Sequence, residues 1–343
     1  MTRRDIVIAQ IRHLETNPVP YWLRIDEEVA QRLDVHYGGR QWRETIQTFV
    51  EWTDLLNGDK KEPTGTPHRQ RDPYGTVWRT DQRVLHMEVP ALPEPTLAGY
   101  RWPAPEAFYG DAAWVEKAQK ICREKKGQTF LTTWLGRGLF ETSWGLRGFE
   151  NVMMDVVCER SFYEALLDRI MEQFYAWIDH VCETLPEVDA IFLGDDWSDQ
   201  RGVIIGPDRW RELFKPRYAK LYEYIHARGK LIIEHVCGSV SPIIPDLIDI
   251  GLDVLESLQP EAHDMNPYEL KRRWGDKIAF MGGLGSQSII QFGQPRELRD
   301  EIRRLRTEMS RGGGYILAPS KFLQPGTPTE NAAAIFEAFT RNE

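Results

Sequence analysis

The chain has 343 residues, of which 41% are hydrophobic and 28% are charged, and its formal net charge at pH 7 is -9. This composition indicates a folded chain with a large core, and its acidity argues against a nucleic-acid partner, whose binding proteins carry a basic face. No apolar run approaches the roughly 18 residues that a membrane helix needs. The four cysteines are widely spaced and the residues after Met1 lack a signal-peptide core, so we expect reduced thiols in a cytoplasmic protein.

The N-terminal third has an irregular pattern. Residues 20–24 and 48–55 are predicted strands. The stretch 58–105 is rich in Pro, Gly and Thr, and within it residues 76–80 and 83–89 are expected to pair as a β-hairpin. We therefore expect 58–105 to be an irregular hairpin insertion.

From residue 129 onward, strands and helices alternate with little interruption. Further strands are predicted at 129–134, 188–193, 230–235, 253–257, 278–281 and 315–318. Helices are predicted at 161–184, 207–229, 242–250, 267–274, 295–310 and 328–340, with Ser161 as a cap and Pro207 near the start of its helix.

Serial strand–helix units imply parallel pairing through right-handed crossovers. With the two N-terminal strands the count reaches eight. The pattern therefore predicts the α/β class, as a single (β/α)8 TIM-type barrel over residues 1–343 with the inserted hairpin in its N-terminal third. A doubly wound open sheet is the alternative. It is disfavoured because no strand is followed by a dinucleotide-binding glycine fingerprint.

The segment 231–238, Leu-Ile-Ile-Glu-His-Val-Cys-Gly, carries the sharpest chemical signal. Residues i and i+2 of a strand point to the same face, so His235 and Cys237 are expected to project side by side. Imidazole and thiolate are ligands that zinc prefers. We expect this strand end to contribute part of a metal site.

In a parallel barrel, the active site is built from residues that follow the C-terminal ends of the strands. Asp195 and Asp196 occupy such an end, and adjacent carboxylates repel unless they point apart or meet a cation. Each is a candidate metal ligand, general acid or base, or substrate anchor, and the alternatives are a helix cap and a solvated loop charge. Lys321 is a candidate anion anchor or Schiff-base amine, or a solvated lysine.

Several motifs together resemble the uroporphyrinogen decarboxylase superfamily, including its methylcobalamin-linked methyltransferases. They are Gly-Asp-Asp at 194–196, Glu-His-Val-Cys-Gly at 234–238, Phe-Met-Gly-Gly-Leu-Gly at 280–285, the segment 313–320, and Thr-Pro-Thr-Glu-Asn at 327–331. The resemblance covers about residues 125–343 and implies a single barrel.

The resemblance also implies a metal. The His235/Cys237 pair looks like the zinc motif of the methyltransferase branch, whose third ligand is usually a cysteine in the last strand–helix loop. Lys321 occupies that place here, and lysine is a poor zinc ligand because its amine is protonated near neutral pH. Either Glu256 or Asp196 completes the coordination, or the metal is lost and Lys321 acts as a cation.

The expected function is that of a methyltransferase-like enzyme, which moves a methyl group from a small methoxylated or methylated substrate to a separate corrinoid protein. The expected site comprises the metal ligands His235, Cys237 and Glu256, the catalytic residues Asp195, Asp196 and Lys321, and the substrate-binding residues Arg24, Phe140, Glu141, Trp197 and Gln259. One alternative is a metal-free decarboxylase or lyase in which Lys321 and Arg24 bind a carboxylate while Asp196 handles a proton. Another is a binding protein that kept the barrel and lost the chemistry.

Overall fold

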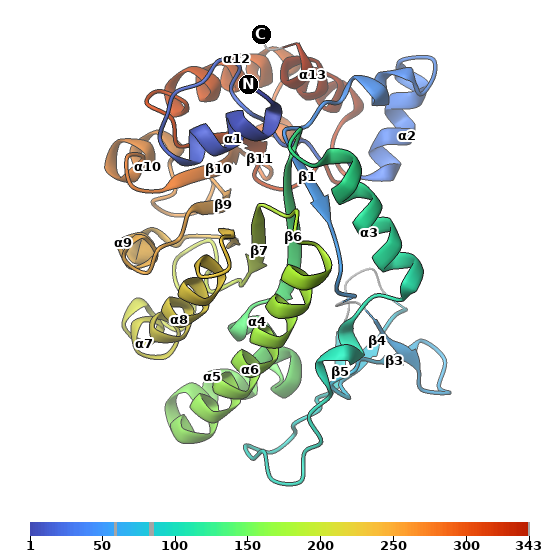
Figure 1. Cartoon of the computed structure of the whole chain (residues 1–343), viewed down its shortest axis with the longest axis vertical. Coiled ribbons are helices and arrows are strands. Elements are labelled where there is room, and N and C mark those ends of the chain that lie inside the picture. Colours follow the sequence, from blue (N-terminus) through green and yellow to red (C-terminus); the bar gives the residue numbers. More distant parts are fainter. Residues whose placement is uncertain (58–59, 82–85, 342–343) are drawn as a thin grey trace.

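A curled half-barrel sheet of seven parallel strands forms the centre of the molecule (Figure 1). The computed structural model describes residues 1–57, 60–81 and 86–341. The strands, in spatial order, are β1 (Val50–Thr53), β6 (Phe130–Arg137), β7 (Ala190–Gly194), β8 (Leu231–His235), β9 (Val254–Leu258), β10 (Ala279–Leu284) and β11 (Tyr315–Pro319). Every residue of β7, β9, β10 and β11 is buried, as expected for apolar runs in a parallel sheet covered on both faces.

The predicted first strand, at 20–24, lies between the two edge strands of this sheet. Tyr21 forms an isolated parallel bridge with Leu317 of β11. Its carbonyl oxygen accepts a hydrogen bond of 3.0 Å from the N–H of Phe49, just before β1. The segment makes isolated bridges and no regular ladder, and Pro20 within it has no N–H to donate. The sheet therefore has seven regular strands where eight were predicted.

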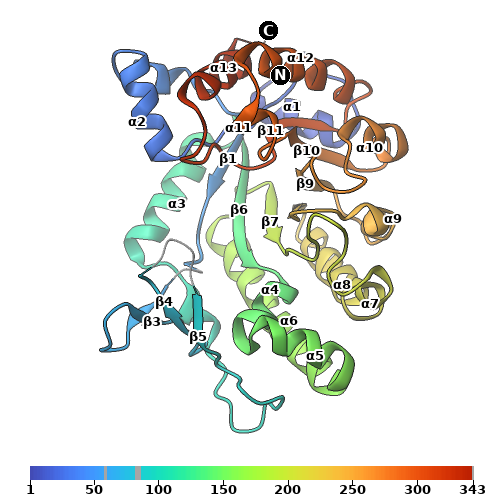
Figure 2. The ribbon, with the colours of Figure 1, turned by 180° about the vertical axis from the view of Figure 1, so that it is seen from behind.

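Helices surround the sheet in both views (Figures 1 and 2). They are α1 (Arg3–Ile11), α2 (Glu27–His36), α3 (Ala112–Lys125), α4 (Leu139–Arg147), α5 (Phe149–Cys158), α6 (Arg160–Thr184), α7 (Pro207–Leu213), α8 (Lys215–His226), α9 (Ile244–Asp249), α10 (Pro267–Trp274), α11 (Ile289–Phe292), α12 (Pro295–Met309) and α13 (Thr329–Thr340). Short 3-10 helices are η1 (Gln41–Thr45), η2 (Pro105–Phe108) and η3 (Ser241–Ile243). No helix among the described residues is both long and apolar enough to cross a lipid bilayer.

Several helix boundaries differ from the sequence prediction. The helix predicted at 242–250 begins as the 3-10 helix η3, and two further differences concern Ser161 and the helix predicted at 207–229. Helix α6 begins at Arg160, so Ser161 lies inside its first turn and is not the cap. The helix predicted over 207–229 is two helices, α7 and α8, that meet at Phe214. Pro216, in the first turn of α8, has no N–H for a continuous helix and forces the break.

The stretch predicted as an insertion contains a second, antiparallel sheet. Its strands are β2 (Glu62–Pro63), β3 (Arg69–Arg71), β4 (Val77–Arg79) and β5 (His86–Val89), paired in that order. Strands β4 and β5 fall within the two predicted hairpin segments, although residues 83–85 lie outside the described residues. The sheet lies at the end of the molecule away from both chain termini (Figures 1 and 2). The Thr76 hydroxyl attaches it to α4 by donating to the Gly145 carbonyl at 2.9 Å.

Candidate metal centre and adjoining cavity

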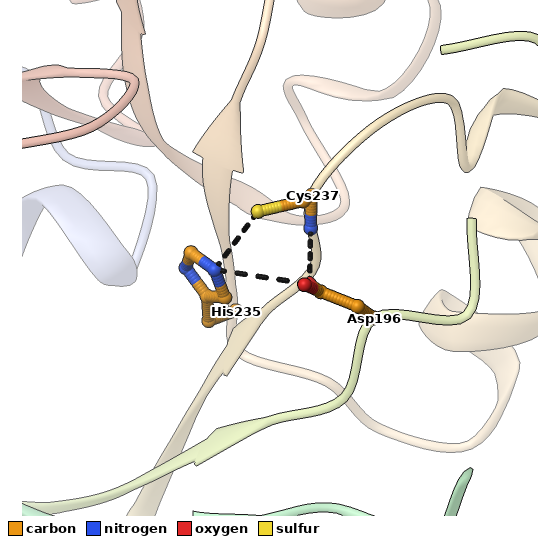
Figure 3. A group of neighbouring side chains, drawn as sticks. All are labelled: Asp196, His235 and Cys237. Carbon is orange, nitrogen blue, oxygen red and sulfur yellow. Dashed lines mark hydrogen bonds and ion pairs between the residues drawn. The ribbon is translucent and has the colours of Figure 1, made fainter. Parts of the chain in front are cut away.

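Three ligand-type side chains meet beyond the C-terminal ends of β7 and β8 (Figure 3). Asp196 follows β7, His235 ends β8, and Cys237 comes two residues later. One donor atom from each lies within 4.8 Å of the others, and all three residues are partly exposed. His235 Nε2 is 3.2 Å from Cys237 Sγ and 3.9 Å from Asp196 Oδ1. Because parallel strands end at one edge of a sheet, short segments far apart in sequence meet here.

The geometry of this cluster fits a zinc ion. Tetrahedral zinc with ligands at about 2.0 Å for nitrogen and about 2.3 Å for sulfur keeps its ligand atoms roughly 3.5 Å apart. The two separations from His235 Nε2, 3.2 and 3.9 Å, lie on either side of that value. Three protein ligands leave a fourth position open, which is the arrangement of catalytic zinc sites. The side chains of Asp196 and His235 are 41% and 20% exposed, so a substrate can reach that position.

Glu256 of β9 holds the other ring nitrogen of His235 and is not placed beside Cys237. Its buried carboxylate contacts His235 Nδ1 in a very short hydrogen bond. Glu256 was predicted as a metal ligand; in the structure its carboxylate contacts His235, and the ligand atoms that lie together are those of Asp196, His235 and Cys237. A carboxylate on the far nitrogen is the usual support of a metal-bound histidine.

A β-bulge lies directly after Glu256. Met281 of β10 pairs with Glu256 while Gly282 pairs with Leu258, so Ser257 has no partner in the ladder. Ser257 has φ +58°, a left-handed backbone that non-glycine residues seldom adopt. Bulges of this kind re-aim neighbouring side chains and are frequent beside active sites.

The charge state of His235 follows from these contacts. Burial lowers the pKa of His235, but the Glu256 carboxylate and the Cys237 contact outweigh burial, so the pKa lies well above its usual value. Surroundings that retain a proton on the ring also favour another cation in its place.

The loop after Cys237 is fixed from three sides. The Cys237 N–H donates to Asp196 Oδ1 at 2.9 Å, and the Ser198 hydroxyl donates to the Cys237 carbonyl at 2.5 Å. Gln259 accepts from the Gly238 N–H at 3.0 Å, so this predicted substrate-binding residue positions the loop. Gly238 has φ +84°, and a Cβ there would lie 2.3 Å from the Asp199 carbonyl oxygen.

Asp195 is fully buried, and its carboxylate has different hydrogen-bond partners from that of Asp196. It accepts hydrogen bonds from the N–H groups of Phe140 and Glu141, at 2.9 and 2.8 Å, and so caps the N-terminus of α4. Tyr218 and Trp197 also donate to it, at 2.7 and 2.6 Å. Burial raises the pKa of Asp195 to about 6, although all four hydrogen bonds oppose the shift. The predicted catalytic Asp195 thus occupies a structural position.

Two predicted substrate-binding aromatics belong to the core. Phe140 and Trp197 are each 2% exposed. Phe140 packs on Phe214, with ring centroids 6.0 Å apart, and Trp197 packs on Tyr218 at 4.8 Å.

Glu141, in the first turn of α4, is a predicted site residue whose acidity is strongly perturbed. Burial raises its pKa to about 8, and the Asp196 and Asp195 carboxylates add to the effect. Glu141 therefore keeps its proton at neutral pH, and it is near enough to Asp196 and His235 for their charges to affect its pKa. A carboxyl group with a pKa near the working pH is suited to general acid and base chemistry.

Glu141 also lines a cavity of about 350 Å³ between the antiparallel sheet and the ends of β6 and α4. Aromatic rings supply much of the wall: Tyr74, Trp78, Phe108, Trp114, Trp134 and Trp177. The Trp134 ring packs against Gly194, since a Cβ on Gly194 would lie 2.2 Å from it. The cavity wall therefore adjoins the segment that bears Asp196. The twelve tryptophans of the chain indicate that an aromatic pocket could exist, but their sequence positions do not predict which of them meet here.

Arg24 and Lys321 lie on adjoining segments at the same edge of the sheet. The guanidinium carbon of Arg24 is 5.9 Å from the Trp52 ring centroid and 5.4 Å from that of Phe322, the neighbour of Lys321. Within the described part of the chain, Lys321 Nζ makes no hydrogen bond or ion pair; its backbone N–H donates to Ser286 Oγ at 2.7 Å. Both cations remain candidates for holding an anionic group.

The fold and this cluster define an α/β half-barrel protein with a candidate metal centre at its strand ends. Residues 86–341 match the uroporphyrinogen decarboxylase (URO-D) family, and the chain belongs to that family. The resemblance inferred from the motifs is thereby confirmed.

Known relatives include methyltransferases. The chain is 25% identical over 224 residues to methylcobamide:CoM methyltransferase MtaA of Methanosarcina barkeri, across 65% of this chain and 62% of that protein. MtaA of Methanosarcina barkeri strain Fusaro is 24% identical over the same extent. The match thus spans less than two thirds of these relatives. The solved structure of a methyltransferase from Methanosarcina mazei shares the fold, with a TM-score of 0.72, 20% identity and 99% coverage of both chains.

Proposed function

We propose that this protein is a methyltransferase-like enzyme that transfers a methyl group from a small methylated substrate to a corrinoid carried by a separate protein. The observation that carries the proposal is the Asp196, His235 and Cys237 cluster, supported by Glu256, at the strand ends of a URO-D family chain. The relationship to MtaA supports methyl transfer as the class of reaction.

Asp196, His235 and Cys237 would hold zinc, with Glu256 orienting the histidine. Zinc would act as a Lewis acid that polarises the heteroatom bearing the methyl group. The partial exposure of the three ligands leaves room for that atom. Glu141, protonated near neutral pH, would supply a proton to the leaving group beside the substrate.

The finer architecture is also proposed. We infer that the segment around Tyr21 closes the seven strands into an eight-membered barrel, because it is hydrogen-bonded toward both edge strands. Residues 58–105 would then be an insertion in a single domain that covers residues 1–343. The partly exposed side of the site, around Cys237, would be the side that meets the corrinoid.

The proposal is tested by supplying reduced free cobalamin in place of the partner and following methylcobalamin formation by absorbance with candidate methyl donors. Turnover that needs zinc and is lost in Cys237→Ala supports it. Failure of purified protein to bind zinc, together with unchanged behaviour of Cys237→Ala, would contradict it.

A metal-free decarboxylase or lyase is the second candidate, favoured by the proximity of Arg24 to the segment that bears the unpaired Lys321. The two cations would hold a carboxylate, and Asp196 would handle the proton. Carbon dioxide release without cobalamin would support this function over methyl transfer. Borohydride trapping of a carbonyl-bearing substrate on Lys321 would show that the lysine acts through a Schiff base and not as a simple anion anchor.

A further inference from the structure

A second cavity, of about 500 Å³, lies at the opposite edge of the parallel sheet from the metal-site cluster. Its walls come from the turn after α1 and from the segments just before β10 and β11, so it adjoins the N-terminal ends of the strands. Among the described residues that line it, one is a carboxylate, Asp276. Five are cations: Lys271, Arg272, Arg273, Lys277 and Arg311. The cavity is therefore strongly basic, in a chain whose net charge is -9.

The dipole of helix α10 accounts for only part of this positive charge. Basic side chains in the last turn of a helix are favourable at its negative end, and Lys271, Arg272 and Arg273 occupy that turn. Lys277 lies beyond the helix, and Arg311 comes from the turn that follows α12. The fold thus brings cations from separate segments to one cavity, against the Coulomb repulsion between them.

A close backbone approach builds the cavity. Lys271 Nζ donates to the Gly275 carbonyl at 3.2 Å and also to the Gly313 carbonyl, so it draws the turn before β11 onto the end of α10. Gly313 and Gly314 have φ +78° and +77°. A Cβ on Gly314 would lie 2.9 Å from the Gly275 carbonyl oxygen. Lys271 therefore has a structural role, and the other four cations remain for a ligand.

Three of these four cations have no protein counter-charge. Within the described part of the chain, Arg273, Lys277 and Arg311 form no ion pair, and all three are exposed. Arg273 and Lys277 lie 5.1 and 5.9 Å from the Trp274 ring centroid. Contact with a ring face orients a cation and leaves its N–H donors free for an anion.

We propose that this cavity binds a small molecule that carries adjacent phosphate groups. Phosphate oxygens accept charge-assisted hydrogen bonds from guanidinium and ammonium groups, and two linked phosphates can contact cations on both walls at once. Burial lowers the pKa of His13, which also lines the cavity, so this ring adds no charge at neutral pH. The site is separate from the metal centre, and the inference does not depend on the proposed function.

The test is calorimetry of the wild-type protein with inorganic pyrophosphate and with sulfate, at one ionic strength and without added divalent cations. Pyrophosphate should bind at millimolar concentration or below, and about ten-fold or more tightly than sulfate. Equal affinity for the two anions would show general charge screening and would overturn the proposal. So would the absence of pyrophosphate binding at about 10 mM.

Variants tie the binding to this cavity. Lys277→Gln and Arg311→Gln, both at exposed positions that the fold should tolerate, should each weaken pyrophosphate binding about three-fold or more. Asp276→Asn removes the one carboxylate and should tighten binding. The matched control is Arg296→Gln in α12, whose side chain is 93% exposed and lies outside the cavity, and it should change nothing.

The rival anion site is the one at Arg24 and Lys321, near the C-terminal strand ends. Pyrophosphate binding should be unchanged in Lys321→Ala if the basic cavity is the site. Binding that is lost in Lys321→Ala but unchanged in Lys277→Gln and Arg311→Gln would overturn the proposal.

Discussion

The Glu256 carboxylate binds Nδ1 of His235 and leaves Nε2 facing Cys237 and Asp196. One buried acid thus fixes the direction of the histidine, and it would fix the tautomer once a metal replaced the proton on Nε2. The relationship makes Glu256 a positioning residue.

Glu256→Gln should weaken zinc binding about 10- to 100-fold while leaving the stoichiometry at one ion. The amide can still accept from the ring but no longer adds negative charge. Competition with a chromophoric chelator measures the affinity. Glu150→Gln, an exposed change in α5, is the matched control. If Glu256→Gln bound zinc as tightly as that control, Glu256 would not support the site.

Lys321→Ala should retain the full zinc affinity, because the candidate cluster consists of Asp196, His235 and Cys237 and includes no residue of the last loop. In the same variant, the KM for an anionic substrate should rise if Lys321 holds its charge, with little change in kcat. Zinc titration and steady-state kinetics separate the two effects. Loss of zinc from Lys321→Ala would show that the last loop takes part in coordination.

Asp195→Asn should lower the free energy of unfolding by about 2 kcal/mol, since the amide cannot accept all four buried hydrogen bonds. Urea denaturation measures the difference. Asp111→Asn is the control, because Asp111 caps exposed α3 and asparagine caps equally well. A change below about 0.5 kcal/mol at Asp195 would mean that α4 does not depend on this carboxyl.

Glu141 predicts a pH effect on stability. Its folded pKa, about 8, exceeds the value of 4.5 expected for an unperturbed glutamate, so the folded state binds the extra proton between these limits. Its contribution to stability is complete below the unfolded pKa and is lost as pH rises through the folded one.

From about pH 5.5 to about pH 8.5, wild type should therefore lose at least about 1 kcal/mol of stability relative to Glu141→Gln. Unfolding in chelator-containing buffers at both pH values tests this expectation. Parallel changes in the two proteins would show that Glu141 titrates normally.

The sequence alone predicts which residues lie at the C-terminal ends of the strands. The period-two pattern places His235 beside Cys237, and the strand–helix alternation brings Asp196 to the same edge of the sheet. Both signals are local or repeat along the chain. The prediction of an inserted hairpin also rested on local turn residues, and β4 and β5 lie in that segment.

Tertiary contacts decided what sequence could not. The Asp195 carboxylate accepts a hydrogen bond from Tyr218 of α8. Glu256 lies directly before the bulge at Ser257, which has no partner in the ladder between β9 and β10. The cavity forms only where Asp72 and Trp78 of the insertion meet Glu141 of α4. Contacts between segments that are far apart in the sequence leave no pattern within any one of those segments.

The central claim, that Asp196, His235 and Cys237 form a metal centre, is tested most directly by cobalt substitution. Chelator-treated protein titrated with Co²⁺ should show the intense ligand-field bands of a tetrahedral site and a thiolate-to-cobalt charge-transfer band, saturating at one ion. Cys237→Ser should lose the charge-transfer band, and zinc should displace the cobalt. A weak octahedral spectrum, or a charge-transfer band that persists in Cys237→Ser, would contradict the claim.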